Sequence, residues 1–216
     1  MVVTYGNPNA SVVLIQMVDD HDLEGIESEA QEIQRLTDSD FCLMTQKVQN
    51  WNNDLSPWKA PAVFGKDGFG EGASQTLASV LECLHAQNKI YIIGGYSLAG
   101  LFALWAAYQT NLFAAVAAAS PSVWFPGFVD YMKANEIKSG TVYLSLGDKE
   151  EKARNPVMAS VGDRIREAHA WLKECGICTT LEWNQGNHFK DADIRTARAF
   201  AWAMKQSVGG KSVVSK

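Results

Sequence analysis

The chain has 216 residues, of which 47% are hydrophobic and 20% charged, as in an ordinary globular protein. This length suffices for one substantial core, so we expect a single domain over residues 1–206 and a polar, flexible tail over residues 207–216. The net charge of −5 comes from acidic and basic residues mixed along the chain, which argues against nucleic acid or membrane partners. Without a bilayer-spanning apolar run or a signal peptide, we expect a cytoplasmic protein of undetermined oligomeric state.

Short apolar segments alternate along the chain with longer segments of helical periodicity. Most apolar segments are hydrophobic on both faces, as strands of a buried parallel sheet are. We predict strands over residues 12–18, 41–48, 89–94, 113–119, 141–146 and 178–183. We predict helices over residues 25–37, 73–87, 98–109, 127–135, 157–175 and 192–206. This alternation predicts a three-layer α/β/α sandwich, with functional residues in the loops beyond the carboxyl ends of the strands.

The third predicted strand runs directly into a tight turn and a helix, with Ser97 at the turn. A nucleophilic serine at such an elbow needs small residues two positions before and two after it, and Gly95 and Ala99 satisfy this need. Gly100 gives additional room. The alternatives are an ordinary serine in a glycine-rich strand-to-helix turn and a phosphate-binding turn. A dinucleotide fingerprint would require a third glycine deeper in the helix and an acidic residue about 20 positions on, and the sequence has neither.

A serine hydroxyl needs a neighbouring base to become a nucleophile, and His188 is the best candidate. It is the only histidine that lies in a loop after a late strand, whereas His85 and His169 lie within predicted helices. His21, in an acidic loop that precedes the serine, is expected to have at most a supporting role. A carboxylate should then follow the strand over residues 141–146, where Asp148, Glu150 and Glu151 compete for the role.

No metal site or organic cofactor is predicted. The residues around His21 are consecutive and cannot all turn toward one ion without a special loop. Cys175 and Cys178 have the spacing of a redox motif, but no second cysteine pair or nearby histidine completes a metal site. We therefore interpret these cysteines as ordinary reduced thiols.

From about residue 12 to residue 206 the chain resembles the α/β-hydrolase superfamily, and within it the esterase group that includes esterase D and the siderophore trilactone esterases. Four segments carry the resemblance: the elbow at residues 95–100, the Ala-Ser-Pro-Ser-Val-Trp segment at residues 119–124, the turn at residues 146–150, and Gly186-Asn187-His188. The resemblance implies a hydrolase with Ser97 as nucleophile. It favours Glu150, three residues after Gly147, as the acid, with Asp148 second.

The same resemblance implies a truncated fold and an oxyanion hole. Only residues 2–5 precede the first core strand, so we expect a mostly parallel sheet of about six strands. One oxyanion donor is expected from the backbone N–H of Leu98. The second is expected from the loop after the first core strand, at Val18 or Asp19.

The connection over residues 49–65 is long and unusually aromatic, and long loops without secondary structure are commonly functional. Together with residues that follow the next strand, it could form an apolar substrate pocket over Ser97. The candidates are Trp51, Trp58, Trp124 and Phe125. Simple packing of these aromatic side chains onto the body of the protein is an equally good interpretation.

The sequence therefore predicts an esterase that acts on a small-molecule carboxylic ester through an acyl-enzyme, without a cofactor. A thioesterase, a small peptidase or an acyltransferase would use the same residues. A binding or scaffold protein on a hydrolase fold is the alternative from another class. The presence of all three triad residue types in the expected order argues against it.

Overall fold

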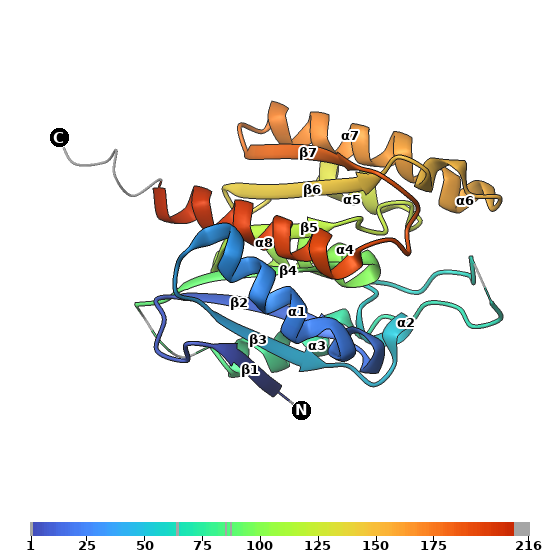
Figure 1. The fold of residues 1–216 in the computed structure, drawn as a ribbon. Coiled ribbons are helices and arrows are strands. Elements are labelled where there is room, and N and C mark those ends of the chain that lie inside the picture. Colours follow the sequence, from blue (N-terminus) through green and yellow to red (C-terminus); the bar gives the residue numbers. More distant parts are fainter. Residues whose placement is uncertain (1, 64, 85, 87, 210–216) are drawn as a thin grey trace.

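The structure is a computed structural model that describes residues 2–63, 65–84, 86 and 88–209. This part of the chain forms one sheet of order β1-β3-β2-β4-β5-β6-β7 (Figure 1). All neighbouring strands pair in parallel except β1, which runs antiparallel to β3. The strands are β1 (Val2–Gly6), β2 (Val12–Val18), β3 (Cys42–Lys47), β4 (Ile90–Tyr96), β5 (Phe113–Ala119), β6 (Thr141–Gly147) and β7 (Cys178–Asn184). The predicted sandwich and all six predicted strands are confirmed, and β1 adds a seventh strand.

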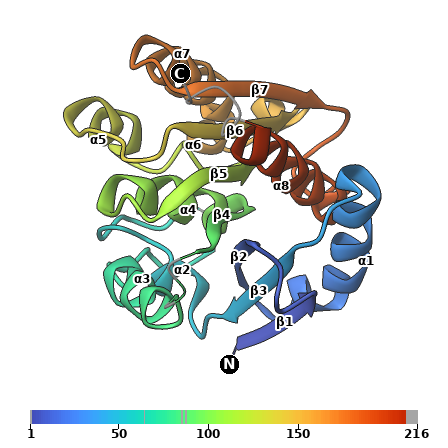
Figure 2. The same ribbon diagram turned by 90° about the vertical axis from the view of Figure 1, so that its left-hand side faces the viewer.

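Helices cover both faces of the sheet, as Figure 2 shows. Helices α1 (Asp20–Thr37) and α8 (Ala192–Gly209) lie on one face and pack against each other. The opposite face carries α3 (Ala73–Glu82), α4 (Ser97–Gln109), α5 (Phe128–Ala134) and α7 (Val161–Glu174). The shorter elements are α2 (Trp51–Asp54), α6 (Pro156–Ala159) and the 3₁₀ turn η1 (Glu150–Lys152). No helix in the described ranges is long and apolar enough to cross a membrane.

Helix α4 fixes the centre of the molecule. It packs against β2, β4 and β5, and its residues from Leu98 to Tyr108 are all buried. A helix that is apolar all round must be enclosed by protein, because no face of it suits water. Its burial holds the first residue, Ser97, at the carboxyl end of β4, where the strand enters the helix directly.

Several predicted boundaries are wrong for local reasons. Helix α1 begins five residues earlier than predicted, because Asp19 and Asp22 form a reciprocal capping box at its start. The predicted helix over residues 157–175 is two helices, with Ser160 between α6 and α7. Asn155 caps α6, and Pro156 occupies its first position, where a missing N–H is harmless.

The ends of two other helices also differ from the prediction. Helix α3 ends at Glu82, and residues 85 and 87 of the predicted segment, His85 included, lie outside the described residues. Helix α8 continues through residues 207–209, which the sequence predicts as part of the tail. Within this extension, the Ser207 hydroxyl donates to the Ala203 carbonyl. The rest of the predicted tail lies outside the described residues.

Candidate active site

Ser97 stands at a sharp strand-to-helix turn of the kind the sequence predicts. Its backbone has φ = +55°, a left-handed conformation that is unusual for a residue with a side chain. The neighbours must be small: a Cβ at position 95 would lie 2.7 Å from the Cβ of Ala99, and one at Gly100 would lie 3.0 Å from the Gly95 carbonyl. The turn therefore presents the Ser97 hydroxyl at the end of the sheet.

His188 lies between Ser97 and Glu150 and contacts both. Its Nε2 is 2.9 Å from Ser97 Oγ, and its Nδ1 is 2.7 Å from Glu150 Oε2. A carboxylate can only accept a hydrogen bond, so the ring proton sits on Nδ1 and the lone pair of Nε2 faces the serine hydroxyl. The Tyr96 hydroxyl donates to the His188 carbonyl at 2.8 Å. Burial raises the pKa of Tyr96, which keeps it a donor to this loop.

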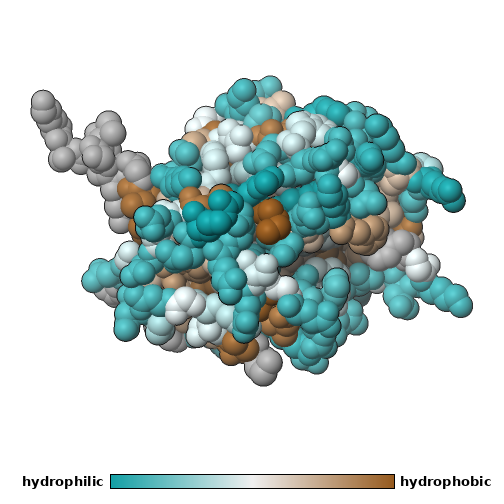
Figure 3. All heavy atoms as spheres, viewed as in Figure 1, coloured by the Kyte–Doolittle hydropathy of each residue, from teal (hydrophilic) through white to brown (hydrophobic). Residues whose placement is uncertain are grey.

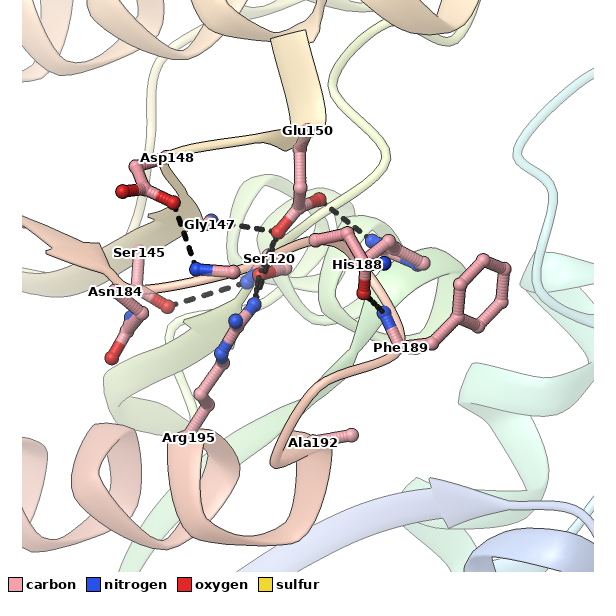
Figure 4. Close-up of polar contacts among 12 residues, drawn as sticks. Ser120, Ser145, Gly147, Asp148, Glu150, Asn184, His188, Phe189, Ala192 and Arg195 are labelled. Carbon is pink, nitrogen blue, oxygen red and sulfur yellow. Dashed lines mark hydrogen bonds and ion pairs between the residues drawn. The ribbon is translucent and has the colours of Figure 1, made fainter. Parts of the chain in front are cut away.

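Glu150 is held from the side opposite His188, as Figure 4 shows. The residue is 7% exposed, and its Oε1 accepts from the Gly147 N–H at 2.7 Å, the Ser120 hydroxyl at 2.8 Å and Arg195 Nη1 at 3.1 Å. These donors occupy one carboxylate oxygen and leave Oε2 to the imidazole. The carboxylate is thereby fixed in position.

The other two carboxylates of this turn point elsewhere. Asp148 Oδ1 accepts from the Gly186 N–H at 2.8 Å, and Figure 4 shows Asp148 and His188 on opposite sides of Glu150. Glu151 pairs with Arg166 at 2.8 Å. Of the three carboxylates that the sequence offered, Glu150 is the one that contacts the histidine.

Sequence reasoning missed Arg195, which is 2% exposed. Besides Glu150, its guanidinium donates to the Tyr96 hydroxyl at 3.1 Å, to Ser120 Oγ at 3.4 Å and to the Gln185 carbonyl at 3.3 Å. The helical spacing could have indicated that Arg195 is buried. Arg195 stands four residues before Ala199 on one face of α8, and this spacing predicts that both are buried.

A cleft of about 850 Å³ opens over Ser97 and His188. Trp51 and Trp124 line it, as expected of a substrate pocket, and so does Phe69, which the sequence analysis did not single out. Trp58 and Phe125 are absent from the lining and pack against each other, with ring centroids 5.7 Å apart. Within this loop, Trp51 thus lines the cleft, whereas Trp58 packs onto the body of the protein.

The structure supports one of the predicted oxyanion donors. Leu98, in the first turn of α4, lines the cleft beside Ser97. Val18 and Asp19 do not line it: Val18 is fully buried, and the Asp19 N–H donates to Asp22 Oδ2 at 3.1 Å. The capping box of α1 thus already uses the Asp19 N–H that an oxyanion would need. The Ser122 hydroxyl, 3.3 Å from Ser97 Oγ, is a polar group that sequence reasoning did not find.

Three basic residues border the cleft beside η1. Lys149, Lys152 and Arg154 line the cavity, and within the described ranges none of them forms an ion pair. Their positive charge is therefore available to a bound molecule. His21, by contrast, is exposed on α1 and lies 3.8 Å from Glu24, away from the cleft. No group of three metal-ligating side chains occurs in the residues that the structure describes.

The chain is similar to several proteins, although no protein-family model matches it. It is 23% identical to the uncharacterised protein YbbA of Bacillus subtilis over 199 residues, 83% of this chain and 78% of that one. An IroE-like serine hydrolase from Shewanella oneidensis matches 93% of this chain and 74% of its own, with a TM-score of 0.75 and 16% identity. The siderophore hydrolase EstA from Aspergillus nidulans matches 94% of this chain and 85% of its own, with a TM-score of 0.63 and 18% identity. The chain thus has the α/β-hydrolase fold.

Proposed function

We propose that the chain is a serine hydrolase that cleaves small-molecule carboxylic esters. The observation that carries the proposal is the unbroken series of hydrogen bonds from Ser97 through His188 to Glu150 at the mouth of a cleft. Such a series makes a serine hydroxyl nucleophilic. The serine hydrolase and siderophore hydrolase named above share the fold and add support.

Each residue would act as its contacts allow. His188 Nε2 would take the proton as Ser97 Oγ attacks the carbonyl carbon, and Glu150 would stabilise the imidazolium through Nδ1–H. The Leu98 N–H would donate to the oxyanion of the tetrahedral intermediate. The imidazolium would protonate the leaving alcohol, and a water activated by the same histidine would then release the acyl group from Ser97.

A covalent probe tests the nucleophile. A fluorophosphonate should label the wild-type protein, and Ser97→Ala should remain unlabelled. Ser122→Ala is the matched control. It removes the hydroxyl that lies 3.3 Å from Ser97 Oγ and should leave labelling in place. Labelling of Ser97→Ala at another serine would refute the assignment, and an unlabelled wild type would favour a non-catalytic binding protein.

Hydrolysis of 4-nitrophenyl esters tests the reaction itself. Turnover requires that the lone pair of His188 Nε2 accept the proton of the serine hydroxyl. Ser97→Ala and His188→Ala should each lower kcat by at least about a thousandfold. Equal turnover by Ser97→Ala would contradict the proposal.

A further inference from the structure

A second cavity lies beside the cleft, between α1 and the start of α8. Its volume is about 440 Å³, and Gln16 at the end of β2 and Tyr96 at the end of β4 contribute to its lining. Phe189, which directly follows His188, lines both cavities and is 87% exposed. The two cavities therefore adjoin, although the catalytic mechanism makes no use of the second one.

The second cavity is strongly acidic. Among the described residues no lysine or arginine lines it, and its ionisable groups besides Tyr96 are His21, Asp22, Glu24, Glu29, Asp191 and Asp193. His21 lies 3.8 Å from Glu24, and Lys190 lies 4.0 Å from Asp191. In the described part of the chain, Asp22, Glu29 and Asp193 have no ion-pair partner. No basic side chain of the described residues therefore pairs with these three carboxyl groups.

Two buried side chains in this lining have unused acceptor atoms. Gln16 is 3% exposed and Glu29 is 4% exposed, and Gln16 Nε2 donates to Glu29 Oε2 at 3.3 Å. Within the described residues, Gln16 Oε1 and Glu29 Oε1 are buried without a hydrogen-bond partner. Buried polar atoms are nearly always paired, so two such acceptors at one cavity indicate a missing donor.

We propose that this cavity binds a primary ammonium group. A compact ammonium carries three donors, which suits Gln16 Oε1, Glu29 Oε1 and the carboxylate of Asp193. A guanidinium fits less well, because Glu29 has only one free oxygen and cannot accept a bidentate fork. A metal ion is disfavoured, since no three of the acidic side chains in the described residues are placed to hold one.

The remaining lining suits the carbon chain of an alkylammonium ion. The rings of Tyr96 and Phe189 provide apolar surface and faces that attract a cation. Figure 3 shows that the face over α1 and α8 is largely hydrophilic, with isolated hydrophobic residues. Such a face suits a small polar ligand better than an apolar protein partner.

Titration of the protein with n-butylammonium at pH 8, followed by two-dimensional NMR, tests this proposal. We expect saturable binding with a millimolar Kd and the largest shifts at the backbone amides of Gly25 and Thr196, which line the cavity. Glu29→Gln should weaken binding at least about tenfold, the loss of one charge-assisted hydrogen bond. Glu27→Gln is the matched control, because it removes an exposed charge from the same helix and should change nothing.

Other outcomes would overturn the proposal. They are the absence of saturable shifts up to 100 mM, equal binding of n-butanol, tighter binding of n-butylguanidinium, or unchanged binding by Glu29→Gln. If Glu29→Gln does not fold, Asp193→Asn decides the question, since its half-buried carboxylate should contribute several-fold to affinity. Unchanged binding by Asp193→Asn would then refute the site.

The pH dependence of binding is a second readout. Burial raises the pKa of Glu29 well above its ordinary value of 4.5, and the charges of Asp22 and Asp193 add to this. The carboxyl must lose its proton to pair with an ammonium, so binding should be tighter at pH 8 than at pH 6, and Asp22, whose pKa burial raises to about 6, adds to this change. The remaining binding by Glu29→Gln should tighten less over this range, and an equal change would contradict the role of Glu29.

Discussion

Replacing Arg195 by methionine tests whether this residue holds the triad acid. The side chains of Arg195 and Glu150 are 2% and 5% exposed, with 3.1 Å between their charged atoms. Removing one partner of a buried ion pair costs about 3 to 5 kcal/mol, because the other charge is left uncompensated. For a domain of this size, that loss should lower the melting temperature by about 6 to 20 °C.

The same substitution should lower catalysis. Glu150 Oε1 would lose one of its three donors, and a hydrogen bond to a charged group contributes about 1.5 to 3 kcal/mol. If that energy orients the carboxylate toward His188, kcat should fall about tenfold to a hundredfold. KM should change little, because Arg195 does not line the cleft. The pH dependence of kcat should also change, because a buried charge 3.1 Å from the triad acid is removed.

The assays are thermal unfolding by circular dichroism and the pH dependence of 4-nitrophenyl ester hydrolysis. Arg198→Met is the control: Arg198 lies on the same helix, is 47% exposed and is 3.6 Å from Glu182. A surface pair of this kind contributes at most about 1 kcal/mol to stability, so the control should melt close to the wild-type temperature and retain wild-type kcat. An Arg195→Met protein with wild-type melting temperature and pH profile would refute the positioning role.

Three further predictions concern the charges around the two cavities. Glu150→Gln should lower kcat by about 10³- to 10⁴-fold. Asp148→Asn keeps an acceptor for the Gly186 N–H and should hydrolyse 4-nitrophenyl esters at nearly the wild-type rate. The reverse order would assign the acid to Asp148. Lys152→Glu should lower kcat/KM several-fold more for the 4-nitrophenyl monoester of glutaric acid than for 4-nitrophenyl butyrate, and an equal effect would show that the rim does not recognise anions. Burial raises the pKa of Glu29 above 4.5, so its contribution to stability is present below pH 4.5 and is lost as pH rises toward the folded pKa. Urea unfolding between pH 5 and 8 should therefore show Glu29→Gln gaining on the wild type by up to about 1.4 kcal/mol per pH unit, and parallel curves would contradict this.

The sequence was sufficient to predict Ser97 and His188, because both depend on local pattern and chain order. The elbow is contiguous, and its small residues are required by contacts within the same turn. His188 was the only histidine in a loop after a late strand. The choice between Glu150 and Asp148 is different, because it depends on contacts with Ser120 and Arg195, far away in the sequence.

Two candidate site residues have contacts that compete with the roles considered for them. The Asp19 N–H belongs to the capping box of α1. Trp58 could not line the cleft, since its Nε1 donates to the Pro126 carbonyl and its ring packs on Phe125. Neither partner follows from the periodicity of the segment in which the residue lies. Such contacts become visible only once the fold brings distant segments together.

The chain has a net charge of −5, but the charged residues on the two sides of Phe189 differ in sign. On one side, Lys149, Lys152 and Arg154 border the cleft over the nucleophile. On the other side, the ionisable residues of the described chain that line the cavity are acidic apart from Tyr96 and His21. An anionic ester would therefore be attracted to the cleft and repelled by the acidic cavity, and an alkylammonium ion the reverse. One exposed ring thus lies between two cavities that select ligands of opposite charge.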